Sequence, residues 1–491
     1  MTLPHHFHQV RPTTWYARER LREKGQFWTP LWLAQAMVAY VLQESHHVFD
    51  PAIGRGAFLQ AMGALHVHNL SYYGFDVDPT VLEDALFQQA GVIVEVRDFL
   101  AAPPQQRFAA IVANPPYIRH HRLPAPTKAM LQQRCKEITG FRLDGRTGYH
   151  VYFLLQALHL LQINGRLAFV VPADTAEGCS APMLWQWITT QYCLEDVITF
   201  HPSAAPFPNV DTNALVVLIR NVPPKPVFWW GACHQPDGDT LREWMTTKNL
   251  TPPPTMLTVE QRSIQEALQT GLSRPRRTVT TQSCLGDFAT VMRGIATGAN
   301  DFFFLTRQQA QELKLPDDVL RIAVGRTRDV LGDELTDTDI ERLDTAGRPT
   351  QLLALTQTDQ MTQAIQDYLL QGIAYGLPQR ALLKQRNPWY VMEQRRVPPI
   401  LFAYLGRRNT RFIRNRAGAL PLTSFLCVYP RTLDENAIDR LWQACNHAAT
   451  LANLRGVAKS YGSGAIKVEP RSLERLPIPD DVVTMYGLRE H

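Results

Sequence analysis

The 491-residue sequence lacks long apolar runs. Its longest nearly continuous apolar stretch, Leu31 to Leu42, is interrupted by Gln35 and is shorter than the roughly 18 residues that a membrane-spanning helix needs. The first residues contain no apolar segment behind basic residues, so no secretory signal is expected. The sequence therefore predicts a soluble, cytoplasmic protein.

The sequence also lacks paired cysteines. Its 7 cysteines are an odd number, they are widely scattered, and none forms a CxxC pair. This pattern predicts reduced thiols rather than a disulfide framework, and it argues against a zinc site. We expect no bound metal.

The sequence also lacks a strong net charge of either sign, since its formal net charge is only +5. This mean value alone argues neither for a protein that coats nucleic acid nor for an acidic tail. Most of the 50 basic residues are arginines, which suit bidentate contacts to phosphate and guanine. Codon bias in a GC-rich genome explains the arginine preference equally well.

Short β-like runs alternate with helical patterns between about Val48 and Ile219, which is typical of a doubly wound α/β sheet. The prolines from Pro223 to Pro226 then indicate a domain boundary. We expect a first domain over residues 1–222, a linker over 223–272 that contains a helix from Val259 to Leu272, and a mixed α/β second domain over 273–491. The expected strands are 48–50, 72–76, 92–96, 108–114, 166–172, 194–200 and 214–220, and the expected helices are 31–42, 79–89 and 149–161.

The tetrapeptide Asn114-Pro115-Pro116-Tyr117 follows the fourth expected strand, at the edge where open α/β sheets bind ligands. The two prolines stiffen the loop, so the side-chain oxygen of Asn114 and the carbonyl of Pro115 become fixed acceptors. Two such acceptors suit a planar amino group, and Tyr117 offers a face on which its ring can stack. A tight turn with a packed tyrosine is the structural alternative.

Three earlier strands end in residues that suit a nucleoside. Asp50 precedes a turn with two glycines, Asp76 is placed to bind ribose hydroxyls, and Asp98 can accept from an adenine amine beside Phe99. Each of them alone is an ordinary polar strand end. Three such ends before the Asn-Pro-Pro-Tyr loop predict a nucleoside cofactor.

The second domain contains a basic and aromatic stretch. Between Arg386 and Arg416 there are eight arginines and a single acid, Glu393. The aromatic residues interleaved with them are Trp389, Tyr390, Phe402, Tyr404 and Phe412. Such a stretch is typical of a nucleic-acid surface, although a solvated face has the same composition.

In this order, GQFWTP (25–30), DPAIGRG (50–56), GFDVDP (74–79), RDFL (97–100) and ANPPY (113–117) resemble the motifs of the class I S-adenosylmethionine-dependent DNA adenine methyltransferases. The order matches the gamma group, whose familiar members are the TaqI-type enzymes of restriction-modification or phage-defence systems. Phe207, between two prolines, occupies the position of the family's second stacking residue. Gly294 to Phe302, Pro388 to Tyr390 and Ser460 to Gly464 resemble landmarks of its recognition domain.

The resemblance implies a Rossmann-like catalytic domain followed by a DNA target-recognition domain. It implies catalytic roles for Asn114, Pro115, Pro116, Tyr117 and Phe207. It implies contacts to S-adenosylmethionine for Phe27, Thr29, Pro30, Asp50, Pro51, Ala52, Gly54, Gly56, Asp76, Val77, Asp98 and Phe99. From the basic segments and landmarks we expect DNA contacts from Arg119, Arg122, Arg395, Arg396, Arg407, Arg408, Arg411 and Lys467.

These residues predict methylation of the 6-amino group of an adenine that is flipped out of double-stranded DNA. The expected partners are DNA and a cognate restriction endonuclease or defence subunit, and the expected state is a monomer without a fused nuclease. Methylation of a protein glutamine or of RNA adenine remains an alternative, since both use a similar loop. A non-catalytic DNA-binding subunit is a third possibility, which the intact loop disfavours.

Overall fold

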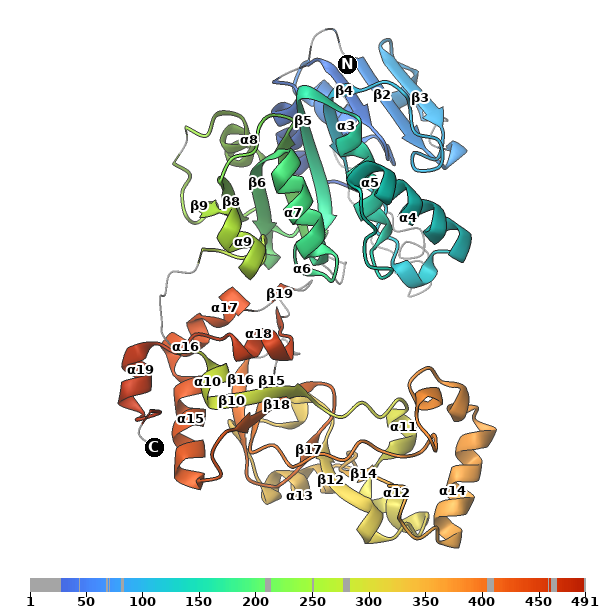
Figure 1. Cartoon of the computed structure of the whole chain (residues 1–491), viewed down its shortest axis with the longest axis vertical. Coiled ribbons are helices and arrows are strands. Elements are labelled where there is room, and N and C mark those ends of the chain that lie inside the picture. The colour runs from blue at the N-terminus through green and yellow to red at the C-terminus, as the bar shows by residue number, and fades with distance from the viewer. Residues whose placement is uncertain are drawn as a thin grey trace. The chain divides into compact units, whose positions relative to one another are not determined.

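A computed structural model describes residues 28–43, 45–67, 69, 71–80, 84–207, 213–249, 251–276, 283–403, 410–457, 459–460 and 466–489. The chain divides into two compact units, one with the described residues up to Arg276 and one with those from 283 onward (Figure 1). Within these ranges, no helix is long and apolar enough to cross a membrane. All seven cysteines are free, as the sequence predicts.

The first unit is built on a nine-stranded sheet with the order β3-β2-β1-β4-β5-β7-β6-β8-β9. Its strands are β1 (His47–Asp50), β2 (Ser71–Asp76), β3 (Val92–Val96), β4 (Phe108–Ala113), β5 (Leu161–Pro172), β6 (Cys193–Phe200), β7 (Ala214–Arg220), β8 (Val227–Cys233) and β9 (Leu257–Ser263). The pairs from β3 to β5 are all parallel, whereas β7 runs antiparallel between β5 and β6. This is the doubly wound α/β sheet that the sequence predicts.

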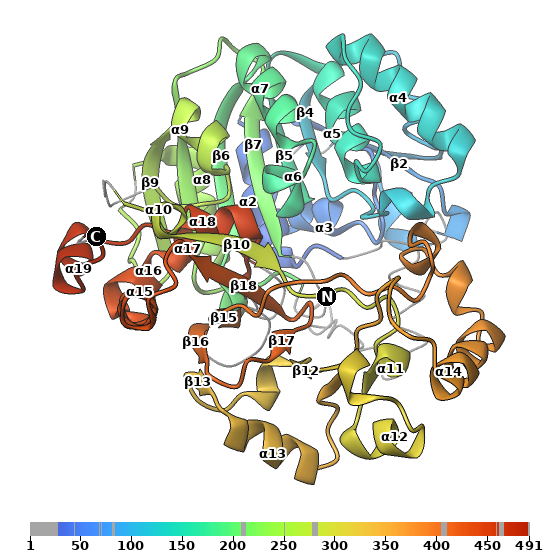
Figure 2. The same ribbon diagram turned by 60° about the horizontal axis from the view of Figure 1, so that its bottom comes forward.

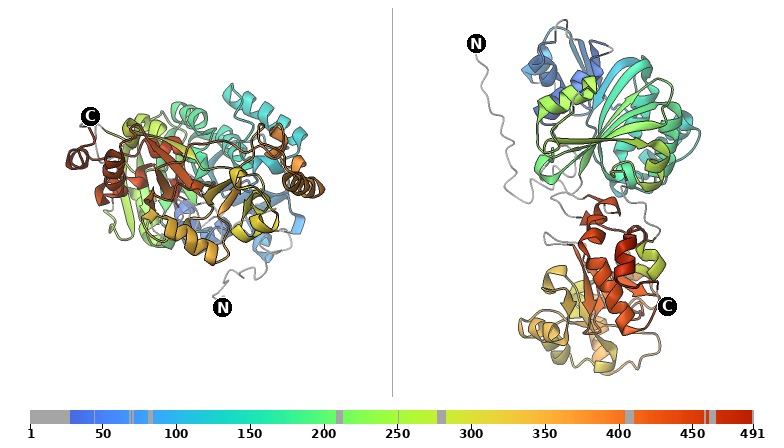
Figure 3. Two further views of the ribbon diagram at one scale, coloured as in Figure 1. Left: turned by 90° about the horizontal axis from the view of Figure 1, so that it is seen from below. Right: turned by 90° about the vertical axis from the view of Figure 1, so that its left-hand side faces the viewer.

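Helices cover both faces of this sheet (Figures 2 and 3). One face packs against α2 (Leu31–Val41), α3 (Ala57–Ala64) and α8 (Gly238–Thr247). The other packs against α5 (Tyr149–His159), α6 (Asp174–Glu177), α7 (Ala181–Gln191) and α9 (Ile264–Thr270), with α4 (Ala125–Thr139) contributing Leu131 and Cys135 to the same cluster. Strands buried on both faces explain the nearly continuous apolar runs from β4 to β7.

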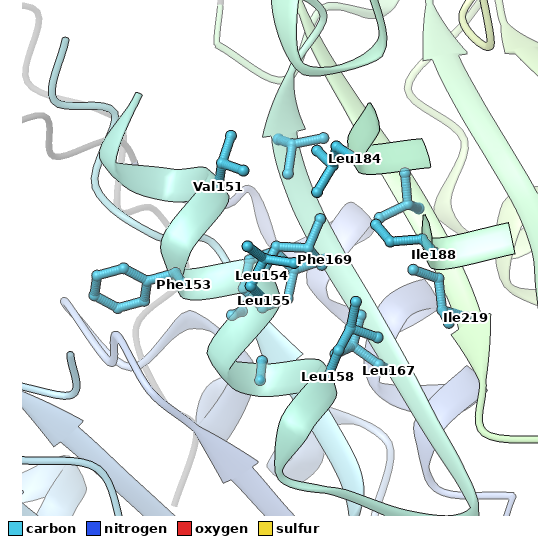
Figure 4. Packing of buried hydrophobic residues seen from close by; sticks show 14 of the residues in the cluster. Val151, Phe153, Leu154, Leu155, Leu158, Leu167, Phe169, Leu184, Ile188 and Ile219 are labelled. Atoms are coloured by element: carbon cyan, nitrogen blue, oxygen red, sulfur yellow. The ribbon is translucent and has the colours of Figure 1, made fainter. Parts of the chain in front are cut away.

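The buried helix α5 is held firmly against β5 and α7 (Figure 4). Leu154, Leu155 and Leu158 pack with Leu167 and Phe169 of β5, and all five side chains are at most 1% exposed. Each such side chain contributes roughly 1.5–3 kcal/mol when it is removed from water. The packing therefore fixes the position of the helix and of its N-terminal turn.

The segment that the sequence predicts as a linker is instead part of the first sheet. Residues 227–270 form β8, α8, β9 and α9, and β8 pairs in parallel with β6. The helix expected from Val259 to Leu272 is a strand as far as Ser263, because these residues pair with β8 at the edge of the sheet. The helix expected at 79–89 is reduced to the 3-10 turn η2 (Ala85–Gln88), with residues 81–83 outside the described part.

The second unit is a mixed α/β domain, as expected. A five-stranded sheet has the order β10-β18-β15-β16-β13, and a four-stranded sheet has the order β11-β14-β12-β17. Their bounds are β10 (Ala289–Arg293), β11 (Phe304–Leu305), β12 (Leu320–Val324), β13 (Glu334–Leu335), β14 (Gln351–Leu353), β15 (Ile400–Ala403), β16 (Arg411–Asn415), β17 (Leu420–Pro421) and β18 (Phe425–Pro430); β19 (Lys459–Ser460) and β20 (Ile466–Lys467) form a separate pair.

Short helices surround these sheets. They are α10 (Leu285–Phe288), α11 (Asn300–Phe303), α12 (Arg307–Glu312), α13 (Asp337–Thr345), α14 (Gln363–Ala374), α15 (Glu435–Asn446), α16 (Ala448–Ala452), α17 (Leu454–Val457), α18 (Pro470–Glu474) and α19 (Asp480–Met485). The helical segment after Asp434 is divided at His447, which ends α15 and caps α16 through its side chain. An amphipathic pattern alone does not reveal this break.

Gly294 joins the two sheets of the second unit at a close backbone approach. Its amide donates to the Phe425 carbonyl at 3.1 Å, and a Cβ at position 294 would collide with the Leu422 carbonyl. We predict that Gly294→Ala destabilises this unit by about 1–3 kcal/mol, because the colliding atom is backbone and has little freedom to move. Denaturant unfolding measures the change.

Gly332→Ala is the matched control, since the nearest atom to its added Cβ is 3.9 Å away. It should leave the unfolding midpoint nearly unchanged. Equal midpoints for the two variants would contradict the close-approach explanation.

Candidate functional site

Four polar residues lie at one edge of the first sheet, where adjacent parallel strands end. Asp50 ends β1 and Asp76 ends β2, while Asp98 and Asn114 follow the ends of β3 and β4. Because the strands are neighbours in the order β3-β2-β1-β4, the four positions form a row with a spacing of about 4.8 Å per strand. The edge lies at the carboxyl ends of the strands, which is where open α/β sheets bind ligands.

The Asn114 side chain is held in a defined orientation. Its Nδ2 group donates to the hydroxyl of Thr29 at 3.1 Å, and Thr29 is buried just before α2. The resemblance places Thr29 beside the cofactor, and the structure adds this contact to Asn114. Since the amide nitrogen faces Thr29, the Asn114 oxygen is the end that can accept from an amino group.

The loop that follows Asn114 is braced by α5. Pro115 is buried, Pro116 and Tyr117 are partly buried, and the Ile118 carbonyl accepts from the amide of Tyr149, the first residue of α5, at 3.0 Å. Burial raises the pKa of Tyr117 well above its usual value, so its hydroxyl stays protonated. The rigid helix thus fixes the end of the loop.

Asp50 lies beneath the glycine turn and is completely buried. One carboxylate oxygen accepts from the Tyr72 hydroxyl at 2.7 Å and the other from the Ala52 amide at 3.0 Å. Burial and the nearby Asp76 raise the pKa of Asp50 to about 7, against the effect of these hydrogen bonds. Asp50 therefore shapes the turn from below, and its charge is costly unless a cation is nearby.

Asp76 holds the same turn from the neighbouring strand. Its carboxylate accepts from the Gly54 amide at 2.9 Å and from the Asp78 amide at 3.0 Å. Gly54 has φ +55° and an added Cβ would meet no atom within 4 Å, so the turn borders open space. This combination suits close approach of a ligand to the backbone.

The third strand end agrees only in part with the expectation. Asp98 accepts from the amides of Leu100 and Ala101 at 2.9 and 3.1 Å, and remains partly exposed. Phe99, expected as a stacking platform, is only 1% exposed, and its ring lies 5.3 Å from that of Phe153 and 5.8 Å from that of Phe49. The structure therefore places Phe99 in the hydrophobic core, where it packs against Phe153 of α5.

Tyr149 is a residue that the sequence analysis did not single out. It is partly buried, and its pKa is raised by burial and by the charge of Asp98. It therefore lies between the third strand end and the Asn-Pro-Pro-Tyr loop. Its position directly after Gly148, at the start of an apolar helix, is the sequence feature that could have identified Tyr149.

The remaining residues of the expected site are placed as follows. Phe207 is buried with the core cluster that contains Phe200, Ala204 and several side chains of α2. Val77 is exposed, Pro30 caps the start of α2, and Pro51, Ala52 and Gly56 belong to the turn after β1. Phe27 lies outside the described residues.

Cations cluster just after the Asn-Pro-Pro-Tyr loop. Arg119 and Arg122 are exposed, and the pKa of His120 is lowered by burial and by the charges of His121, Lys128 and Arg146. The side chains of His120, His121, Lys128 and Arg146 therefore lie near one another in space. Asp144 offsets part of the charge through its ion pair with Arg146 at 2.8 Å.

Three arginines of the basic stretch in the second unit, Arg411, Arg414 and Arg416, pair with acids that are distant in sequence. Arg414 is 2% exposed, and Arg411 donates to the carbonyls of Gly332 and Val330. The ion pairs are Arg395 with Glu393, Arg411 with Asp333, Arg414 with Glu435 and Asp439, and Arg416 with Glu334 and Asp439. The local charge count therefore overestimates the positive charge that this stretch presents.

Its aromatic residues are also mostly structural. Phe402 and Phe412 are fully buried with ring centroids 4.7 Å apart, and Trp389 packs against Phe302. Arg396 is exposed above the ring of Tyr429. Arg407 and Arg408 lie outside the described residues, as does the side chain of Lys467.

The landmark around Gly294 is part of the internal framework of the second unit. The Arg386 guanidinium donates to the carbonyls of Ala296 and Thr297 at 2.6 and 3.2 Å. It therefore ties the glycine-rich segment to the chain just before Pro388. Among the described residues, no cluster of three or more His, Cys, Asp or Glu side chains forms a metal site.

Comparison with protein families gives one match for each unit. The N-6 DNA Methylase model matches residues 13–202. The model for the C-terminal domain of Type II methyltransferase M.Eco57I matches residues 269–489. The two matches fall on either side of residue 227, where β8 begins.

Two curated relatives match nearly the whole chain. Type II methyltransferase M.AccI of Acinetobacter calcoaceticus is 25% identical over 93% of this chain and 85% of its own length. Type II methyltransferase M.XamI of Xanthomonas campestris pv. amaranthicola is 24% identical over 94% of this chain and 86% of its own. The solved structure of the Type IIL restriction-modification enzyme MmeI in complex with DNA shares the fold, with a TM-score of 0.52 and 12% identity over 96% of this chain and 73% of that one.

The burial of Asp50 predicts that the free energy of unfolding of the unliganded protein depends on pH. Its pKa is 3.8 in ordinary surroundings and about 7 in the fold, so the unfolded chain loses this proton first as the pH rises. Stability should therefore fall between pH 4 and 7, by up to about 1.4 kcal/mol per pH unit for this group, and stay level above pH 7.

Asp50→Asn removes this contribution and keeps an oxygen that can accept from Tyr72. We expect the free energy of unfolding of the variant to exceed that of the wild type by an amount that grows from pH 4 to pH 7. Urea unfolding at several pH values measures it. A difference that is constant across this range would contradict the burial of a costly carboxylate.

Proposed function

We propose that the chain is a site-specific N6-adenine DNA methyltransferase of the gamma class, a modification enzyme that acts with S-adenosylmethionine. In this proposal it transfers a methyl group to the 6-amino group of an adenine flipped out of double-stranded DNA. The orientation of Asn114, fixed by Thr29 at the carboxyl end of β4, is the single observation that carries the proposal.

The adenine amino group is a poor nucleophile, because its electron pair is conjugated with the ring. With its oxygen turned away from Thr29, Asn114 accepts one amine hydrogen, and the Pro115 carbonyl accepts the other. These contacts orient the nitrogen and favour its pyramidal form, so catalysis is positioning and electrostatics. The nitrogen–methyl bond forms as the sulfur–methyl bond breaks, and the amine then loses a proton to solvent.

Extrusion of the adenine costs a few kcal/mol, which pocket contacts must offset. Stacking on Tyr117 contributes roughly 1–3 kcal/mol. Phe207 remains the proposed second stacking residue, although its ring is buried in the unliganded fold and has to turn toward the base. Tyr117 is therefore the main platform.

The row of strand ends suits S-adenosylmethionine, which supplies an electrophilic methyl group. Asp50 and the Gly54 turn would hold its methionine portion, Asp76 its ribose and Asp98 its adenine. The raised pKa of the buried Asp50 supports this fit, since a cationic group nearby offsets the cost of its charge. Tyr149, close to Asp98, would line the adenine end.

DNA contacts are proposed for both units. Arg119 and Arg122 lie just beyond the catalytic loop and would bind backbone phosphates near the flipped nucleotide. The second unit would read the target sequence, with the exposed Arg396 as one candidate in the described part of the basic stretch. Arg395 and Arg411 must give up internal contacts before they bind DNA.

We further propose that the enzyme works as a monomer in the cytoplasm, beside a cognate restriction endonuclease or other defence subunit. The similarity to two Type II methyltransferases over most of the chain supports a restriction-modification system.

The deciding experiment incubates the purified protein with methyl-labelled S-adenosylmethionine and, separately, unmethylated bacterial DNA, total RNA or a release factor. We expect label only in DNA, as N6-methyladenine at one short sequence found by methylation-aware sequencing. Asn114→Ala should lose this activity while it still binds cofactor, and Asn249→Ala, an exposed asparagine, should behave as wild type. Label in RNA or protein alone, or an active Asn114→Ala variant, would overturn the proposal.

The Thr29 hydroxyl gives a second prediction. Thr29→Val keeps the shape of the side chain but cannot accept from Asn114, so the amide loses its fixed orientation. We expect the methyl-transfer rate to fall about 5- to 30-fold, as for the loss of 1–2 kcal/mol. Thr29→Ser retains the hydroxyl and should stay within about 2-fold of wild type in a single-turnover assay; an equal loss in both variants would sink the idea.

A further inference from the structure

A buried histidine lies directly behind the catalytic loop and has no part in the reaction described above. His150 is the second residue of α5, and the residues that follow it, from Val151 to Leu155, are buried. The neighbouring residue Tyr149 donates its amide to the Ile118 carbonyl, so this turn of α5 is joined to the loop. His150 therefore sits where helix and loop meet.

The imidazole of His150 contacts the ring of Tyr117. The two ring centroids are 5.7 Å apart and the planes meet at 74°, which is an edge-to-face arrangement. Aromatic pairs favour this geometry, because the positive edge of one ring faces the negative surface of the other. The contact restricts rotation of the Tyr117 ring.

The imidazole itself is held by a hydroxyl on another helix. Its Nε2 lies 2.9 Å from the hydroxyl of Thr175, a buried residue of α6 whose carbonyl accepts from the indole of Trp185 at 2.8 Å. At position 148 an added Cβ would come within 2.5 Å of the imidazole, so glycine leaves the room that the ring occupies. The ring thus has one orientation, defined by Thr175 and Gly148.

The imidazole is also neutral. Burial lowers the pKa of His150 to about 3. Its Nδ1 is buried and makes no hydrogen bond within the described part of the chain. A neutral ring in a fixed orientation is suited to holding a neighbouring side chain rather than to moving a proton.

We propose that His150 is a positioning residue that holds the ring of Tyr117 in the orientation needed to stack on the flipped adenine. Thr175 fixes the imidazole, the imidazole fixes Tyr117, and Tyr117 then receives the base without first having to be ordered. The inference rests on the proposed function, and it adds two residues, His150 and Thr175, that support the adenine-binding tyrosine from behind. Loss of His150 should slow methyl transfer while cofactor binding stays intact.

The test compares single-turnover methyl transfer to unmethylated bacterial DNA by wild type and variants of the full chain. We expect His150→Leu and Thr175→Val to lower the rate about 10-fold or more, with the Kd for S-adenosylmethionine within about 2-fold of wild type. Thr175→Ser retains the hydroxyl and should restore the rate. His159→Leu, at the exposed far end of α5, is the matched control and should not change it.

A double-mutant cycle separates this role from a merely structural one. If His150 acts through Tyr117, His150→Leu has no further effect on the rate in a Tyr117→Ala background. A full additional loss there, or a wild-type rate in folded His150→Leu, would overturn the inference. If His150→Leu fails to fold, the Thr175→Val and Thr175→Ser pair decides in the same way. A wild-type protein that methylates no DNA would instead refute the proposed function.

Discussion

The parallel pairing of β3, β2, β1 and β4 is the constraint on which the site depends. Parallel neighbouring strands end at the same edge of the sheet, so Asp98, Asp76, Asp50 and Asn114 lie in one row. Asp50 and Asn114 are brought together although they are 64 positions apart in the sequence. Helices on both faces bury the strands and keep this edge rigid. Reversal of any of these strands would move its residue to the opposite edge.

Most residues of the row already have partners inside the protein. Thr29 orients Asn114, Tyr72 and Ala52 hold Asp50, and Gly54 is held by Asp76. The polar groups are therefore arranged before a ligand arrives, which lowers the cost of organising them during the reaction. The buried Asp50 makes this arrangement costly, since burial raises its pKa to about 7 and disfavours its charged form.

The sequence predicts this row well, because strand ends and the Asn-Pro-Pro-Tyr motif depend on local patterns. The expected strands from 48–50 to 214–220 coincide closely with β1 to β7. What fails depends on tertiary contacts: a proline-flanked segment pairs as β8, and Phe99 turns into the core. Arg414 is neutralised by Glu435 and Asp439. Both acids lie outside the basic stretch, so a charge count over that stretch misses them. His150 was missed because only packing brings it to Tyr117.

The most direct test of the central claim is a structure of the enzyme with its target duplex and a non-reactive analogue of S-adenosylmethionine. The decisive measurement is the distance from the adenine 6-amino nitrogen to Asn114 Oδ1 and to the Pro115 carbonyl oxygen. The account predicts an extruded adenine with both distances at about 2.7–3.2 Å. An adenine that remains stacked in the duplex, or an amino group bound elsewhere, would contradict it.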